Sequence, residues 1–173
     1  EVEAAFKEVQ ESLGNLSILV HSIAFANRED LGGDFSKTSR EGFRTALDIS
    51  AYSLVLITRH ALPLMREEGG SIITLSFQAS QRVFPGYNIM GTAKAALESE
   101  VRQLAAELGQ WNIRVNALSP GPVDTLSSRV IQDYPTLKRM HSERAPMRRN
   151  ITHEEVAKSA LYLCSDLSSG VSG

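Results

Sequence analysis

The chain has 173 residues, of which 42% are hydrophobic, and this length and composition match a single globular domain rather than a disordered or low-complexity protein. Its formal net charge of −2 leaves no basic excess for a nucleic acid backbone, and no apolar run approaches the ~18–20 residues of a membrane span. We therefore expect neither a nucleic acid nor a membrane partner.

The first half of the chain alternates between patterns typical of helices and of strands. The expected elements are a helix over residues 1–13, a strand over 16–23, a loop over 24–37 and a helix from 38 to 63. The strand is short, apolar and β-branched, which is typical of a strand buried on both faces. Thr38 and Glu41 have the spacing of a capping box, which makes Thr38 the expected N-cap, and Pro63 marks the end of the long helix.

The second half continues the alternation. The expected elements are a strand over residues 71–76, a helix over 87–108, a strand over 112–119, an irregular stretch over 120–151 and a helix from 152 to about 167. Thr152 and Glu155 form a second capping box at the start of the last helix. Strands that alternate with helices of crossover length predict an α/β fold, a Rossmann-like, doubly wound parallel sheet with helices on both faces, in one domain over residues 1–173.

The segments after each strand are where chemistry is expected, because such sheets bind ligands at the carboxyl ends of their strands. Tyr87 and Lys94 begin the helix after the second strand, and their spacing of seven places both side chains on one face. An ammonium close to a phenol lowers the pKa of the phenol and favours its use as a proton donor or oxyanion partner. On spacing alone, a surface tyrosine and a solvated lysine are the alternative reading.

The context of this pair resembles the short-chain dehydrogenase/reductase superfamily. Members of that superfamily place a Tyr and a Lys on this helix and an Asn-x-x-x-x-Gly-Pro segment after the next strand, here Asn116 to Pro122. The seven-residue spacing of Tyr87 and Lys94 is similar to that of a divergent branch, the enoyl-acyl-carrier-protein reductases. Further segments similar to this branch, in the same order, are 21–26, 48–53, 87–91, 146–149 and 163–170.

The resemblance implies an enzyme that reduces the carbon–carbon double bond of a trans-2-enoyl-acyl-carrier-protein thioester in fatty acid biosynthesis, with NADH, or alternatively NADPH, as cofactor. Its catalytic residues would be Tyr87, which stabilises the thioester oxygen, and Lys94, which binds the nicotinamide ribose. The implied cofactor-binding residues are Ile23, Lys94, Val123, Thr125, Leu126 and Ser127. The implied substrate-binding residues are Ala26, Phe77, Tyr87, Met90 and Tyr134. No metal is expected.

Three residues depart from the family pattern. Phe77 stands where the family carries a second tyrosine, so the ring is kept and a hydroxyl is lost, either as a missing hydrogen bond or as a packing adaptation. Asp124 stands where the family usually carries Arg, and Pro120 where it carries Ala. These departures leave open a short-chain reductase with a shifted keto or enone substrate, and a catalytically silent oligomeric scaffold or fragment.

Further expectations concern the whole protein. The glycine-rich βαβ portion of the family and its last strand are expected to lie outside these 173 residues. The helices that begin near residues 38 and 87 are apolar on more than one face, which together with the resemblance implies a homo-oligomer, most simply a tetramer. A basic rim of Lys138, Arg139, Arg148 and Arg149 would face an acidic carrier protein. The single cysteine fits a reducing, cytoplasmic location.

Overall fold

Three parallel strands form the sheet of this computed structural model, which describes residues 1–126, 128 and 133–173. The strands β1 (Ile18–His21), β2 (Gly70–Leu75) and β3 (Ile113–Leu118) lie in the order β1-β2-β3. In this register Val20 pairs with Ile73 of β2, which in turn pairs with Asn116 of β3. The parallel arrangement confirms the predicted α/β class.

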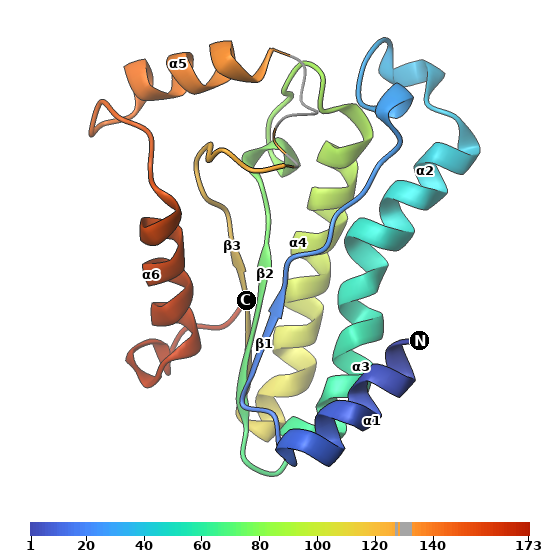
Figure 1. Cartoon of the computed structure of the whole chain (residues 1–173), viewed down its shortest axis with the longest axis vertical. Coiled ribbons are helices and arrows are strands. Elements are labelled where there is room, and N and C mark those ends of the chain that lie inside the picture. Colours follow the sequence, from blue (N-terminus) through green and yellow to red (C-terminus); the bar gives the residue numbers. More distant parts are fainter. Residues whose placement is uncertain (127, 129–132) are drawn as a thin grey trace.

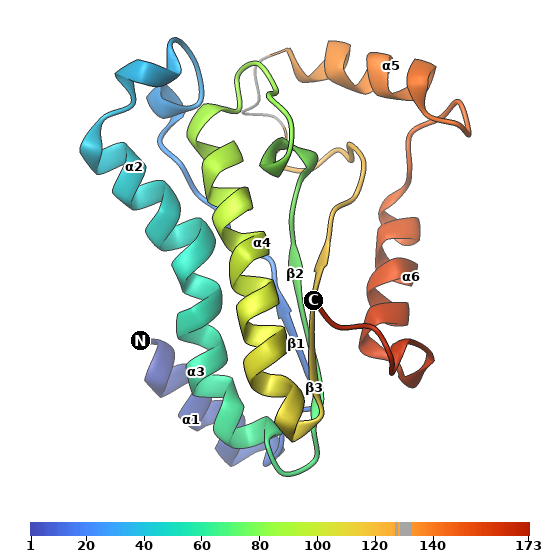
Figure 2. The same cartoon turned by 180° about the vertical axis from the view of Figure 1, so that it is seen from behind.

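Helices cover both faces of the sheet, as the doubly wound prediction requires. In chain order they are α1 (Val2–Leu13), α2 (Arg40–Leu47), the π-helical segment η3 (Asp48–Tyr52), α3 (Ser53–Met65), α4 (Asn88–Leu108), α5 (Tyr134–Arg144) and α6 (His153–Cys164). Helices α3 and α4 lie on one side of the strands, and α6 lies on the other (Figure 1, Figure 2). No helix in the described ranges is long and apolar enough to cross a bilayer.

The main hydrophobic core lies between the sheet and the helices α3 and α4. Leu97, Val101, Leu104 and Leu108 recur at spacings of three and four along α4, so they share one face of that helix and turn it toward the strands. Opposite them, the core includes Ile72 of β2 together with residues of β3 and α3. Each fully buried aliphatic side chain of this kind contributes about 1.5–3 kcal/mol, and together they fix α4 against the sheet.

The first strand differs from its prediction. Ile18 and Val20 are 44% and 56% exposed, so the expectation that this strand is buried on both faces is wrong for the described chain. Ile18 and Val20 point to the same face of β1, while Leu19 points to the other face and packs on the main core; among the described residues, α6 covers β2 and β3 but does not extend over the exposed face of β1.

The long helix after residue 38 begins one residue later than predicted. Ser39 caps it, because Ser39 Oγ accepts a hydrogen bond of 2.8 Å from the Gly42 amide. The hydroxyl of Thr38 donates instead to the Phe35 carbonyl at 2.8 Å, so Thr38 is not the N-cap. The Thr38 hydroxyl thus belongs to the turn over Phe35–Lys37, and the Ser39 hydroxyl to the first turn of α2.

The same helix is also longer and less regular than predicted. It runs through α2, the π-helical segment η3 and α3, and it ends at Met65. Pro63 lies inside α3 and does not end it. The missing N–H of Pro63 removes only one bond from the last turn, and the helix stops two residues later.

A helix in the stretch 120–151 was not predicted. Helix α5 spans Tyr134–Arg144, with Pro135 in its first turn. Proline needs no N–H partner at that position, so it begins a helix as readily as it breaks one. The expectation of irregular structure throughout this stretch is therefore wrong.

Helix α6 begins where its capping box predicts, and hydrogen bonds near its other end attach it to the sheet. Thr152 and Glu155 form the predicted capping box. Near the other end of the helix, the guanidinium of Arg114 on β3 donates to the carbonyls of Leu163 and Ser165 at 2.8 and 3.1 Å. These bonds satisfy carbonyls at the end of the helix that the helix itself leaves unpaired.

Candidate active site

The segments that follow the three strands meet at one end of the sheet. Figure 1 shows this end at the top, where α4 begins and where α5 crosses above the strands. The turn η4 (Gln78–Ser80) follows β2 and packs on α4. The carboxyl ends of the parallel strands therefore face the same region, as a ligand site in an open α/β sheet requires.

Tyr87 precedes the first turn of α4 and is surrounded by apolar side chains. Its ring packs against Phe77 with centroids 4.9 Å apart and planes at 61°, and it adjoins the buried cluster of Met90 and Ala93. Burial raises the pKa of the Tyr87 phenol to about 12. The phenol is therefore protonated at neutral pH and can donate a hydrogen bond.

Lys94 lies two turns further along α4 and is only 6% exposed. Its ammonium donates a hydrogen bond of 2.6 Å to the carbonyl of Leu75, the last residue of β2. Burial lowers the pKa of Lys94 to about 8, although the nearby Glu98 carboxylate acts in the opposite direction. The ammonium form still predominates at neutral pH.

The predicted influence of Lys94 on Tyr87 is wrong. Lys94 was expected to lower the pKa of the Tyr87 phenol, but that pKa is raised. Burial alone raises this pKa, and the Lys94 ammonium donates instead to the Leu75 carbonyl. A protonated phenol remains suited to stabilising an oxyanion, so the correction changes the state of Tyr87 and leaves its predicted role open.

Residues expected at the acyl substrate are brought together beside Tyr87. Ala26, from the loop after β1, packs against the cluster that contains Met90, and Phe77 reaches Tyr87 from the other strand end. Ser50 of η3 holds this loop in place, because its hydroxyl donates to the Phe25 carbonyl and accepts from the Phe25 amide, both at 2.9 Å. Ser50 was missed in the sequence, where no short-range signal links it to residue 25.

The loop after β3 is fastened to α5. Tyr134 is 8% exposed, and its hydroxyl donates to the Val123 carbonyl at 2.5 Å. Thr125 exchanges hydrogen bonds with Ser128, each side chain accepting from the backbone amide of the other at 2.9–3.1 Å. Leu126 is 79% exposed at this loop. The predicted cofactor residue Ser127 lies outside the described residues.

The predicted basic rim is largely paired with acidic groups. Lys138 contacts Asp124 at 2.6 Å, so the acidic departure at position 124 has a local counter-charge. Arg149 makes a two-pronged contact with Glu155, at 2.5 and 2.9 Å. Arg139 lies 4.0 Å from Glu143. These pairs weaken the positive field that was expected at this edge.

His21 joins three elements beneath the site. The hydroxyl of Ser53 donates to the Ile49 carbonyl at 2.6 Å, so it accepts from His21 Nε2–H at 2.8 Å. His21 Nδ1 then accepts from the Thr74 hydroxyl at 2.8 Å. This arrangement suits a neutral ring with its proton on Nε2, and burial, with Lys94 as a second cause, lowers the pKa of His21 to about 4.

Neutral, buried His21 should make the fold sensitive to acid. The unfolded chain takes up this proton near pH 6.5 and the folded chain only near pH 4, so the contribution of His21 is complete above the first value and is lost as pH falls toward the second. Between pH 7 and about pH 4.5 we expect it to lower the free energy of unfolding by about 2 kcal/mol. Urea unfolding of wild type and His21→Gln at both pH values measures the difference, and equal losses in the two proteins would contradict the assignment.

Phe77 is held by rings on two sides. Its ring lies 4.8 Å from that of Phe84 and 4.9 Å from that of Tyr87, between centroids. Two ring contacts favour the packing interpretation of this departure over a simple loss of function.

A hydroxyl added at position 77 should therefore lack a partner. Phe77 is half-buried between the two rings, and a hydroxyl placed between them without a hydrogen bond would cost up to about 1–3 kcal/mol. We expect Phe77→Tyr to lower thermal stability and to lower enoyl thioester reduction, in thermal unfolding and steady-state kinetics on a short and a long acyl chain. A clear rise in turnover on both chains would show that the hydroxyl was the missing group.

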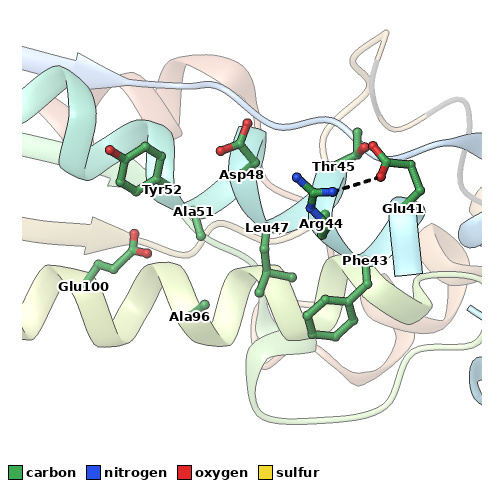
Figure 3. A pocket seen from close by; sticks show the side chains of 10 residues that line it. All are labelled: Glu41, Phe43, Arg44, Thr45, Leu47, Asp48, Ala51, Tyr52, Ala96 and Glu100. Atoms are coloured by element: carbon green, nitrogen blue, oxygen red, sulfur yellow. Dashed lines mark hydrogen bonds and ion pairs between the residues drawn. The ribbon is translucent and has the colours of Figure 1, made fainter. Parts of the chain in front are cut away.

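A hollow of about 510 Å³ lies away from this site, on the outer face of α2, η3 and α4. Figure 3 shows Tyr52 and Glu100 on the two facing elements that border it. Oε2 of Glu100 is buried without a hydrogen-bond partner among the described residues, and burial raises the pKa of this carboxyl. The hollow therefore has the character of an uncovered protein face rather than of the catalytic centre.

A parallel α/β sheet with a protonated tyrosine and a buried lysine at its strand ends has the arrangement expected of a nicotinamide-dependent short-chain reductase. The model of the enoyl-(acyl carrier protein) reductase family matches residues 1–173. The NADH-dependent enoyl-acyl-carrier-protein reductase FabI of a Nostoc species is 51% identical over the whole chain, and the NADPH-dependent FabI of a Staphylococcus aureus strain is 50% identical. In both cases the match covers 67% of the relative.

Solved structures give the same result. The enoyl-acyl carrier protein reductase of Bacillus cereus, solved with NADP⁺ and an indole naphthyridinone, superposes with a TM-score of 0.97 at 48% identity, over 99% of this chain and 66% of that one. The corresponding enzyme of Aquifex aeolicus gives 0.94 at 44% identity, over 99% and 66%.

The chain belongs to the enoyl-acyl-carrier-protein reductase family, as its motifs predicted, and it spans about two thirds of the length of these relatives. The predicted Rossmann-like fold is confirmed by the superpositions. The names of the relatives include both NADH and NADPH, which agrees with the predicted nicotinamide cofactor.

Proposed function

We propose that the protein containing this chain reduces trans-2-enoyl-acyl-carrier-protein thioesters with a nicotinamide cofactor. The observation that carries the proposal is that protonated Tyr87 and buried Lys94 both lie at the start of α4, beside the carboxyl end of β2, in a chain of this family. A shifted keto substrate is the alternative, and the names of the relatives that are 50–51% identical support the enoyl substrate.

The residues of this chain fit a nicotinamide nucleotide. An ammonium carries three donors, and among the described residues that of Lys94 uses one, on the Leu75 carbonyl. The others can bind the ribose hydroxyls. Ile23 and Leu126 are 42% and 79% exposed at strand ends, where an aromatic ring would cover them. When bound, the cofactor supplies the hydride for the reduction.

Tyr87 acts on the other side of the reaction. Reduction at the β-carbon places negative charge on the thioester oxygen, and a fixed phenol O–H directed at that oxygen stabilises the charge. The high pKa of Tyr87 keeps this proton in place at neutral pH. The apolar surroundings of the ring exclude water, which strengthens the interaction.

The test is a comparison of substrates with the full-length protein. We expect oxidation of NADH or NADPH with a crotonyl thioester and little with a β-ketoacyl thioester. Preference for the ketoacyl substrate would establish the shifted reductase, and no oxidation with either would establish a silent scaffold.

The partners proposed are an acyl carrier protein, as the bearer of the substrate, and further copies of the chain. The face around the hollow in Figure 3 exposes Phe43 and Tyr52 by 41% and 43% and contains the Glu100 oxygen that has no hydrogen-bond partner in the described part of the chain. A second copy packed on this face would cover the rings and could provide the missing partner, which supports a closed oligomer, most simply a tetramer. A concentration-independent monomer in sedimentation would contradict it.

The single Cys164 is consistent with a cytoplasmic location for such an enzyme.

A further inference from the structure

Glu98 lies one turn beyond Lys94 on α4, and the mechanism above does not use it. Its Oε1 atom accepts two hydrogen bonds, from the Ser76 hydroxyl at 2.5 Å and from the Ser80 hydroxyl at 2.7 Å. Ser76 follows the last residue of β2, and Ser80 closes the turn η4. One half-buried carboxylate oxygen therefore holds both ends of the segment from 76 to 80 against α4.

Phe77 lies inside this fastened segment. Its ring packs against Tyr87 at 4.9 Å, so the position of the segment determines how Phe77 supports the phenol. Gly91 of α4 makes the close approach possible, because a Cβ atom there would lie 2.9 Å from the Ala79 carbonyl oxygen. The contact between the turn and the helix is therefore tight, and the two serine bonds set its position.

The charge of Glu98 also reaches Lys94. The groups that act on the Lys94 ammonium are neutral His21 from β1, the Leu75 carbonyl from β2 and Glu98 from its own helix, and Tyr87 precedes the first turn of that helix. His21 and Tyr87 carry no charge at neutral pH, so Glu98 is the anion of this set. Its carboxylate opposes the burial that lowers the pKa of Lys94 to about 8.

We propose that Glu98 is a positioning residue for the reduction, which fastens the 76–80 segment so that Phe77 supports Tyr87 and which favours the ammonium form of Lys94. This inference rests on the proposed function, because it assigns Glu98 a part in organising that site. The two effects of Glu98 are separable, since one depends on an acceptor atom and the other on a charge.

Two substitutions in the full-length enzyme separate them. Glu98→Gln retains a carbonyl oxygen that can accept from both serines, and it removes the charge. We expect kcat within about threefold of wild type near pH 6.5, and an alkaline limb of kcat/KM for NADH shifted downward by about 0.5–1 pH unit. Ser80→Ala removes one bond and keeps the charge, so kcat should fall by about three- to tenfold with the limb unmoved. Glu107→Gln, on an exposed side chain of the same helix, is the control and should change neither.

A third variant, Glu98→Ala, removes the acceptor atom and the charge together, so its kcat should fall at least as far as that of Ser80→Ala. The proposal fails if the pH profile of Glu98→Gln coincides with that of wild type, or if Ser80→Ala and Glu98→Ala both keep wild-type kcat. Should Glu98→Ala not fold, the Gln and Ser80 variants decide alone. If the wild type reduces no enoyl thioester, the proposed function fails by itself. NADH binding measured by fluorescence against pH then still tests the Lys94 part, where an unshifted limb in Glu98→Gln would overturn it.

Discussion

Replacing Tyr87 with Phe should lower kcat for enoyl thioester reduction by about 10²–10³-fold, because it removes the one hydroxyl proposed to stabilise the developing charge on the thioester oxygen. The ring contacts with Phe77 and Met90 do not involve that hydroxyl, so packing should be retained. Steady-state kinetics with a crotonyl thioester measure the loss. Fluorescence titration should give an unchanged dissociation constant for NADH.

The matched control is Tyr162→Phe. Tyr162 is 45% exposed on α6, a helix on the opposite side of the sheet from α4, and loss of its hydroxyl should leave kcat unchanged. Thermal unfolding of both variants should agree with wild type. If Tyr87→Phe turns over like wild type while remaining folded, the phenol is not the oxyanion donor.

Replacing Lys94 with Met should weaken NADH binding by about 10²-fold. Met keeps most of the length of the buried side chain but removes the ammonium, together with the donors proposed for the ribose hydroxyls. Loss of hydrogen bonds from a charged group costs about 1.5–3 kcal/mol each, and about 1.4 kcal/mol is a factor of ten. The Leu75 carbonyl also loses its 2.6 Å partner, so stability should fall as well.

The pH dependence provides an independent check. The pKa of Lys94 is lowered to about 8, so wild-type affinity for NADH should decline above that pH as the ammonium loses its proton. In Lys94→Met this decline should be absent. Lys7→Met, on an exposed part of α1, should retain both the affinity and the decline. If Lys94→Met binds NADH with wild-type affinity at pH 7, Lys94 does not contribute to the cofactor site.

Much of the fold could be predicted because local signals and tertiary packing agree. The apolar stripe of α4 and the capping box at Thr152 each gave an element of the right type. The errors occur where a residue type is compatible with two different local structures. Pro135 reads as a breaker, yet it begins α5, and Ser39 displaces Thr38 because neighbouring hydroxyls compete for one cap.

Less of the site could be predicted, because its decisive contacts join segments that are distant in sequence. The spacing of Tyr87 and Lys94 located the two residues. The bond from Lys94 to Leu75, and the burial that raises the pKa of Tyr87 where a lowered pKa was expected, depend on how β2 packs on α4. Glu98 had one local signal, its place four residues after Lys94 on the same helix face. Its two serine partners lie 18 and 22 residues away and have no such signal.

The π-helical segment η3 makes the length of this part of the chain more important than its composition. Ser50, inside the segment, holds the Phe25 backbone, and Ser53, just after it, holds His21. Deleting one residue here would allow a continuous α-helix with better hydrogen-bond geometry. The π-helical turn accommodates one more residue than an α-helical turn, so α2 and α3 would keep nearly the same relative orientation, but the local turn that places Ser50 against the Phe25 backbone would be lost. Homologous chains should therefore change side chains in this segment more readily than they change its residue count.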